Sequence, residues 1–303
     1  MPAPEAAQPH ASPAQEPTAT IPTVTARLHV AGARLAAGPL ELPSDEAHHL
    51  QHVLRARVGT SVRVFDGAGH EWDARVARID RRAVLVDLVA PAAARPEWGV
   101  EVVLAQAVLR GERMDEVVRD ATMLGVAGVQ PMTTAHDAVG GRAGSPRLRE
   151  RWLRVAIASA KQCGRAVVPP IAAVLPFDAA IVARGDRVGL LLVEPAAVAR
   201  LPHPGRGAVA VSSSGEEAAP LSGTGRPTVS LEELRTQACA SGAHVLVGPE
   251  GGWEPGEIVG AVAAGYHPWT LGALTLRADV MALCALSVLR YSWREVLRDP
   301  PGP

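Results

Sequence analysis

The sequence predicts two domains of different class, a small antiparallel β-barrel-like domain followed by a larger α/β domain with a parallel sheet. From residue 27 to about residue 90, apolar and polar residues alternate in short runs, which is typical of antiparallel strands. After a linker rich in proline and alanine at 90–99, apolar runs alternate with segments of helical spacing, which is the pattern of a parallel α/β sheet. We therefore expect domains at 26–92 and 98–298.

The first domain is predicted to hold four strands and one helix. The strands are the alternating runs at 27–30, 61–65, 71–77 and 83–88. Gly59 and the segment Asp66–Gly69 supply turns between them. One helix interrupts the strands from Ser44, its expected N-cap, to about Arg57. Its apolar face is predicted to carry Leu50, Val53 and Leu54.

The second domain is predicted to alternate strands with helices. The strands are expected at 101–109, 126–132, 188–193 and 244–247, and the helices at 113–124, 148–163 and 279–290. In such a sheet, ligands bind in loops at the carboxyl ends of the strands. Two segments are predicted to be disordered: the N-terminal tail 1–25, rich in proline and alanine, and a Gly-, Pro- and Ser-rich insertion at 195–230.

Composition points to a protein of a reducing compartment. Cys163, Cys239 and Cys284 are odd in number and far apart, which fits neither a disulfide framework nor a zinc site. The longest apolar stretch, 280–289, is about half of what a membrane span needs. We expect a soluble, cytoplasmic protein with no membrane association.

The charge distribution leaves two interpretations open. The formal net charge of −1 is not that of a typical nucleic-acid-binding domain. Between residues 140 and 170, however, the chain has seven basic residues and a single acidic residue, Glu150. This segment is equally well interpreted as a solvated helix face or as a strip that follows RNA phosphates.

The most distinctive motif is Gly248-Pro249-Glu250-Gly251-Gly252. It follows a predicted strand directly and precedes a helix signalled by Pro255 and Glu257. Three glycines in five residues allow the backbone to approach a ligand closely, although a glycine-rich turn of this kind also serves as a plain connection.

A second motif, Leu271–Arg277, begins 23 positions after Gly248 and precedes the long apolar helix. Two strand-end loops at this separation can close on one ligand. The sequence contains neither a phosphate-binding P-loop nor a dinucleotide fingerprint. His48, His49 and His52 share a helix face but lack cysteine or carboxylate partners in a metal motif, so we predict no metal site.

The two loops together resemble the hallmark pair of the small-subunit rRNA uridine-N3 methyltransferases, the RsmE family of the SPOUT superfamily. The likeness extends over about 27–290, apart from the insertion. Further matching positions occur in family order along both domains. They are His49-Leu50, Val53-Leu54-Arg55, Gly59, Phe65-Asp66-Gly67, Arg113-Met114, Leu124-Gly125-Val126, Pro131, Trp152, Gln162-Cys163-Gly164-Arg165 and Pro169.

The resemblance implies a PUA-like RNA-binding barrel and an α/β domain with a trefoil knot, one of the few exceptions to unknotted topology. It implies that the protein uses S-adenosylmethionine (SAM) to methylate N3 of a uridine in 16S ribosomal RNA, as naked RNA or in the assembled 30S subunit. It also implies a homodimer. The apolar helix at 279–290 is equally well interpreted as a helix of the dimer interface or as a core helix within its own domain. The cofactor pocket is expected to contain Leu192, Val193, Val247, Gly248, Gly252, Leu271, Gly272, Leu276 and Ala278.

Expected roles in catalysis follow from side-chain chemistry at these positions. Arg165 and Arg277 are expected to stabilise a uracil anion or hold a phosphate, because a guanidinium keeps its charge. Glu250 is expected to act as a base or to orient a donor, with a structural role for its carboxylate as the alternative. The expected contacts to RNA are Gln162, which would read the uracil edge, Arg55 and Arg142.

Three positions depart from the family pattern, and three alternatives follow. The family usually has Arg where this chain has Leu274, and Thr-Glu where it has Ala278-Asp279. One alternative is another SPOUT enzyme that acts on transfer RNA or a ribose hydroxyl, and another is an inactive PUA-like RNA-binding protein. An unrelated hydrolase is disfavoured, because the sequence has no Gly-x-Ser-x-Gly nucleophile motif.

Overall fold

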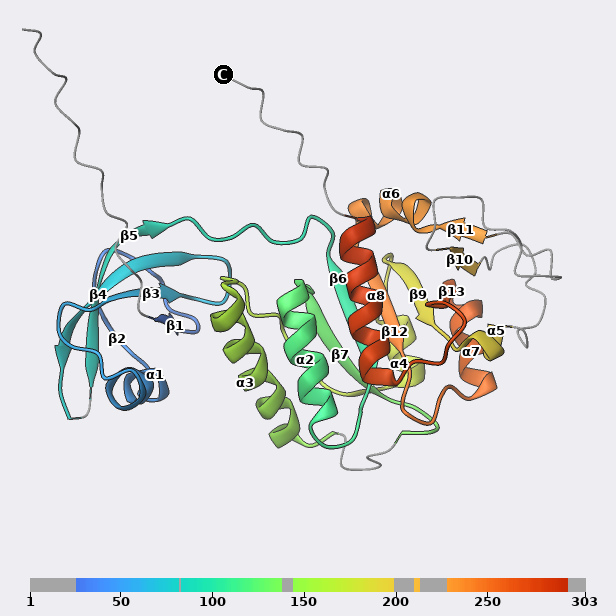
Figure 1. The fold of residues 1–303 in the computed structure, drawn as a ribbon, viewed down its shortest axis with the longest axis horizontal. Helices are drawn as coiled ribbons and strands as arrows, with labels where there is room; N and C mark the ends of the chain where they lie inside the picture. Colours follow the sequence, from blue (N-terminus) through green and yellow to red (C-terminus); the bar gives the residue numbers. More distant parts are fainter. Residues whose placement is uncertain (1–25, 82, 138–143, 199–209, 213–227, 294–303) are drawn as a thin grey trace, which may run out of the picture.

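The computed structural model describes residues 26–81, 83–137, 144–198, 210–212 and 228–293. The predicted tail 1–25 and Arg142 lie outside these residues. Figure 1 shows the two predicted domains side by side, with a β-rich domain at the N-terminal end and helices packed on a sheet in the rest of the chain.

The first domain is a five-stranded sheet around a small apolar core. Its strands are β1 (Arg27–His29), β2 (Gly38–Glu41), β3 (Ser61–Phe65), β4 (Glu71–Ile79) and β5 (Val84–Ala92). They are ordered β1-β3-β4-β5-β2, with β1 parallel to β3 and the other pairs antiparallel. Strand β2 was not predicted. Inward side chains such as Leu28, Val64 and Val86 are fully buried, as the alternation predicted.

The helix of this domain is shorter and wider than predicted. It comprises α1 (Ser44–His48) followed by a π-helical turn, η1 (His49–Val53), and its N-cap is Pro43 instead of Ser44. The amide of Leu54 donates to the carbonyl of His49, a five-residue span that widens the turn. The backbone then leaves the helix at Arg55, where φ is +50°. Val53 is consequently 62% exposed, and its predicted place on the apolar face was wrong.

The second domain is an eight-stranded sheet whose paired strands all run parallel. In spatial order the strands are β11 (Thr228–Ser230), β10 (Ala210–Ser212), β13 (Tyr266–Trp269), β9 (Val188–Leu192), β12 (Ala243–Val247), β6 (Val102–Ala107), β7 (Gly128–Thr133) and β8 (Leu175–Pro176). The helices are α2 (Arg113–Leu124), α3 (Pro146–Cys163), α4 (Phe177–Val182), α5 (Pro195–Val198), α6 (Leu231–Ser241), α7 (Pro255–Ala263) and α8 (Ala278–Ser292). The predicted α/β class is confirmed, whereas the trefoil knot stays a prediction.

The segment 195–230, predicted to be disordered throughout, contributes three short elements: α5, β10 and β11. Strand β10 pairs with β11 and also with β13, more than 50 residues further along the chain. This non-local pairing supplies the order that local composition does not predict. Residues 199–209 and 213–227 lie outside the described part.

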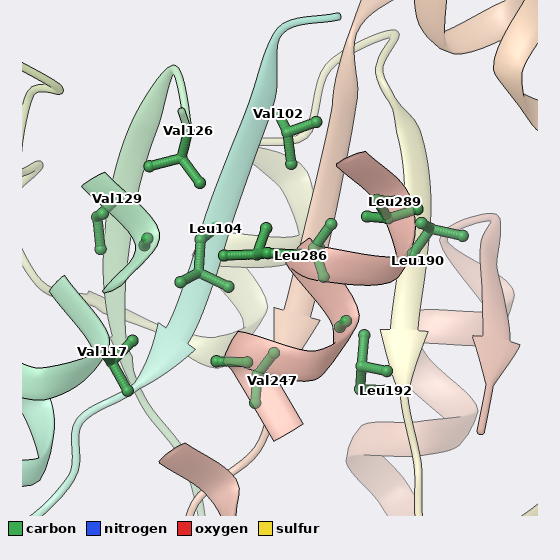
Figure 2. Close-up of a cluster of buried hydrophobic side chains, with 14 of the residues drawn as sticks. Val102, Leu104, Val117, Val126, Val129, Leu190, Leu192, Val247, Leu286 and Leu289 are labelled. Atoms are coloured by element: carbon green, nitrogen blue, oxygen red, sulfur yellow. The ribbon is translucent and has the colours of Figure 1, made fainter. Parts of the chain in front are cut away.

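Helix α8 packs on the centre of the sheet. Figure 2 shows Leu286 and Leu289 of α8 directed at the strands, beside Leu104 of β6 and Leu190 of β9. These residues belong to one large buried cluster, so α8 is a core helix of its own domain. Its other side leaves Leu283 38% and Tyr291 68% exposed in the single chain.

Helix α3 joins the two domains at its C-terminal end. Arg27 of β1 donates to the carbonyls of Ala160 and Arg165 and pairs with the buried Glu71 at 2.8 Å. Lys161 pairs with Glu46 of α1 at 2.7 Å. Arg27, a side chain of the first domain, thereby satisfies carbonyl groups in the last turn of α3.

No helix within the described segments combines the length and the apolar character needed to cross a membrane.

Candidate functional site

A pocket of about 260 Å³ opens where strands β9 and β12 end and helix α8 begins. Carboxyl ends of parallel strands are the usual ligand sites of such sheets. Three segments and one residue of α2 form its walls. They are Leu192–Glu194, Val247–Glu250 with Gly252 and Trp253, Thr275–Ala278 with Met281, and Arg113.

The glycines of the first loop are required by close packing. A Cβ on Gly248 would lie 2.9 Å from the indole ring of Trp253, which is too close for a side chain. Gly252 has a φ of +76°, which favours glycine. The indole Nε1 of Trp253 donates to the carbonyl of Leu192 at 2.8 Å. Trp253 therefore ties the loop after β12 to the end of β9.

Glu250 is held by Arg113, the first residue of α2, and by the segment that precedes this helix. Its Oε1 accepts a hydrogen bond from the backbone amide of Arg110 at 3.3 Å and from Nη1 of Arg113 at 3.1 Å. Both contacts are to one carboxylate oxygen, and they join the middle of the loop to the segment after β6. These two hydrogen bonds support the alternative interpretation, in which the carboxylate of Glu250 has a structural role.

Arg277 stands at the mouth of the pocket as the N-cap of α8. Its Nε and Nη2 donate to the two carboxylate oxygens of Asp279, at 3.1 and 2.5 Å. This hydrogen bond raises the pKa of Arg277 and lowers the pKa of Asp279, so both groups stay charged. Asp279, a departure from the family pattern, orients the guanidinium with its side chain only 8% exposed.

Glu194 contributes a negative charge to the pocket wall. Its carboxylate lies 3.6 Å from where a Cβ on Gly252 would be. Among the described residues, no side chain is paired with this carboxylate, in contrast to Glu250. The pocket therefore offers a negative charge to a positively charged ligand.

The two predicted loops meet in space, as the sequence indicated. Nine residues predicted for the site line the pocket together: Leu192, Val193, Val247, Gly248, Glu250, Gly252, Leu276, Arg277 and Ala278. Leu271 and Gly272 do not line it. Leu271 packs against the hydrophobic core, and Gly272, with a φ of +85°, forms the exposed turn that leads into the second loop.

Arg165 does not line the pocket, so a catalytic role for it stays a prediction that this arrangement does not support. It is 7% exposed and pairs with Glu97. Its Nη1 and Nη2 also donate to the carbonyls of Thr122 and Val126, at 2.7 and 3.1 Å. The guanidinium is therefore engaged inside the protein.

The position of α3 explains why Arg165 lies away from the pocket. The helix starts near the carboxyl ends of the strands and ends at the opposite edge, because 18 residues span about 27 Å. Gln162, predicted to read the uracil, is exposed at that far end. Arg55 is exposed in the first domain, so none of these three residues lies beside the pocket.

Sequence reasoning missed Arg113, Trp253 and Met281 as pocket residues. Arg113 carried a usable signal: it is the first residue of the helix that follows a predicted strand, so it must lie at the carboxyl edge of the sheet. Trp253 directly follows the glycine motif but carries no charge that would have marked it.

The lining suits a ligand with both apolar and charged parts. Leu192, Val247 and Met281 provide apolar surface, while Glu194 and Arg277 provide opposite charges. The groups expected for SAM, an adenosine, a sulfonium and an amino acid, match this mixture. The residues present therefore fit the expected methyl donor.

Comparisons with known proteins agree with this geometry. A model described as RNA methyltransferase domain matches residues 96–205 and 216–290, and one described as RNA methyltransferase PUA domain matches 42–89. The chain is 30% identical over 277 residues to the Ribosomal RNA small subunit methyltransferase E of Synechocystis, covering 91% of this chain and 80% of that protein.

Solved structures show the same fold over both domains. A methyltransferase of Legionella pneumophila with bound SAM is 25% identical, with a TM-score of 0.70, and the match covers 88% of this chain and 98% of that one. The Ribosomal RNA small subunit methyltransferase E of Neisseria gonorrhoeae, bound to SAM, is 24% identical with a TM-score of 0.69, covering 89% and 98%. The chain therefore belongs to the RNA methyltransferase family with an N-terminal PUA domain that includes Ribosomal RNA small subunit methyltransferase E.

Proposed function

We propose that this protein transfers a methyl group from SAM to N3 of a uridine in small-subunit ribosomal RNA. The observation that carries the proposal is the convergence of the loops Val247–Trp253 and Thr275–Ala278 on one pocket. The relatives named as small subunit methyltransferases support the RNA substrate, and the relatives solved with SAM support the donor.

The donor supplies an electrophilic methyl group carried on a cationic sulfonium. Glu194 places its carboxylate in the pocket wall, where it attracts that positive charge. The apolar side chains of Leu192 and Val247 exclude water from the reacting atoms. Holding the two reactants in line supplies on the order of 7 to 11 kcal/mol of the barrier.

Arg277 acts on the acceptor base. Uracil N3 gives up its proton to water, which leaves a uracil anion with negative charge on the neighbouring oxygens. When N3 bonds to the methyl carbon, the bond from that carbon to the donor's sulfur breaks, and the donor would leave as a neutral thioether. A guanidinium stabilises such charge because it offers paired donors and stays protonated. Asp279 keeps this guanidinium at the pocket mouth through two hydrogen bonds.

The RNA must present an unstacked uridine to this pocket, as other base-modifying enzymes require. We propose that the PUA domain binds the flanking RNA, whether the substrate is naked 16S RNA or the assembled 30S subunit. We also propose that the protein works in the cytoplasm as a homodimer that covers the exposed side of α8, including Leu283 and Tyr291.

Incubation of the purified protein with methyl-labelled SAM tests the proposal. Small subunits that lack the modification should take up about one methyl group each, whereas transfer RNA should take up none. Preferential labelling of transfer RNA would contradict the proposed substrate, and no labelling together with no SAM binding would contradict the proposed activity.

A further inference from the structure

A buried glutamine lies directly beneath the glycine loop. Gln106 is on the central strand β6 and is fully buried. It pairs in register with Val247, the last residue of β12 before the loop. Gln106 does not line the pocket, but it lies beside the point where the loop begins.

The side-chain amide of Gln106 supports the first peptide of the loop. Its Nε2 donates to the carbonyl of Gly248 at 3.3 Å and to the carbonyl of Ala107 at 3.1 Å. Pro249 has no N–H, so the carbonyl is the only group by which the Gly248–Pro249 peptide can accept or donate a hydrogen bond. The bond from Gln106 therefore fixes the orientation of this peptide.

The side-chain oxygen of Gln106, in contrast to its nitrogen, forms no hydrogen bond among the described residues. Oε1 of Gln106 is buried and has no hydrogen-bond partner in the described part of the chain. An unsatisfied buried acceptor destabilises the folded state, and a methionine of similar length would avoid it. The donating half of the amide thus accounts for a polar residue at this place.

The orientation of the Gly248 peptide also affects the pocket wall at the end of β9. The indole of Trp253 lies against Gly248, and its Nε1 donates to Leu192 at the end of β9. A rotated Gly248 peptide would press on this ring and disturb both walls together. In the middle of the loop, Glu250 is held separately by Arg113.

We propose that Gln106 is a positioning residue that preforms the donor-binding loop through the Gly248 carbonyl. The identity of the donor rests on the proposed function, but the effect on the loop does not. Removal of the amide should loosen the loop in the ligand-free protein and weaken the binding of SAM.

Gln130 provides a matched control on the adjacent strand β7. It is also buried, and its Nε2 likewise donates to the carbonyl of the next residue, Pro131, at 2.8 Å and to a distant carbonyl, that of Ala173, at 2.7 Å. Within the described part of the chain, the side-chain amide of Gln130 has no hydrogen bond to the pocket loops. Gln106→Met and Gln130→Met remove the same group from similar surroundings.

Amide hydrogen exchange of the ligand-free variants is the first measurement. Gly252 N–H donates to the carbonyl of Pro249 at 3.1 Å and reports on the loop. Because one hydrogen bond to the loop is lost, exchange at Gly252 should be about tenfold faster in Gln106→Met than in the wild type. In Gln130→Met, exchange at Gly252 should be unchanged. Equal exchange in the wild type and Gln106→Met would overturn the proposal, whether or not the protein binds SAM.

Calorimetry with SAM is the second measurement. The Kd should rise about tenfold in Gln106→Met and less than twofold in Gln130→Met. Gln106→Glu, which can donate only while protonated, should bind SAM progressively more weakly as pH rises, and it replaces the methionine variant if that one fails to fold. Equal weakening in both methionine variants, or no pH dependence in Gln106→Glu, would contradict a positioning role. Absence of SAM binding in the wild type would refute the proposed function but not the exchange result.

Discussion

The guanidinium of Arg113 and the carboxylate of Glu250 form an ion pair of 3.1 Å that joins the start of α2 to the middle of the glycine loop. The same carboxylate oxygen accepts the amide of Arg110. A carboxylate engaged in this way holds a loop better than it takes a proton from a substrate. We infer that Glu250 positions the loop.

Glu250→Gln should therefore keep most of the activity. The amide oxygen of glutamine can still accept from Arg110 and Arg113, so kcat should fall less than about tenfold. Glu250→Ala loses both bonds and should raise the KM for SAM by about tenfold. Steady-state kinetics against an exposed control, Glu112→Gln, checks this. Loss of turnover in Glu250→Gln at unchanged SAM affinity would instead identify Glu250 as the base.

Arg277 should affect the chemical step more than donor binding. Arg277→Gln removes the charge that stabilises the uracil anion, so kcat should fall about 100-fold while the Kd for SAM changes less than threefold. Asp279→Asn leaves the guanidinium less well oriented and should cost about tenfold in kcat. Single-turnover methylation with Arg235→Gln of α6 as control separates these effects. Similar kcat values in all three variants would exclude Arg277 from the reaction.

Arg165 should matter for stability and not for turnover. Arg165→Met removes an ion pair and two bonds to buried carbonyls, so the free energy of unfolding should fall by about 2 to 4 kcal/mol. Urea denaturation measures this loss, and kcat per folded molecule should stay within twofold. A large loss of kcat at unchanged stability would restore the catalytic role expected from the sequence.

His244 should make the fold sensitive to acid. Burial, together with the charges of Arg187 and Arg184, lowers the pKa of His244 from 6.5 to about 4 in the folded protein. Above pH 6.5 the ring is neutral in both states. As the pH falls from 6.5 to 4, the imidazole of His244 binds a proton in the unfolded chain but stays neutral in the folded protein. The free energy of unfolding should therefore fall by up to about 3 kcal/mol over this range.

His244→Asn isolates this contribution. The Asn oxygen can replace Nδ1, which lies 2.9 Å from the hydroxyl of Tyr266, without titrating. Urea denaturation at pH 7, 5.5 and 4.5 should show a shallower loss of stability in the variant than in the wild type. Parallel curves would show that His244 does not govern the acid sensitivity.

Local pattern was sufficient for the elements that form the pocket. Helix α2 has the predicted bounds, and the loops after β9 and β12 follow apolar runs that are buried strands. Parallel strands end at the same edge of the sheet, so the convergence of these two loops followed from the topology. Strands β10 and β11 escaped prediction because β11 pairs with β10 and β10 pairs with the distant β13, which local composition cannot show.

The misplaced residues share one physical cause. In a parallel sheet, each connecting helix starts at the carboxyl edge of the strands and returns to the amino edge. Arg113 begins its helix and so lies at the pocket, whereas Gln162 and Arg165 end or follow theirs and so lie at the opposite edge. The order of motifs along the chain does not show at which edge of the sheet a residue lies. The rule for connecting helices, applied to the predicted elements, would have shown it.

The identity of the methylated atom tests the central claim most directly. Small subunits lacking the modification should be incubated with the protein and SAM, and the RNA then digested to nucleosides for mass spectrometry. The two loops and Arg277 predict 3-methyluridine in the digest, and Arg277→Gln should yield about 100-fold less per unit time. A digest that contains 2′-O-methyl nucleosides and no 3-methyluridine would contradict the account.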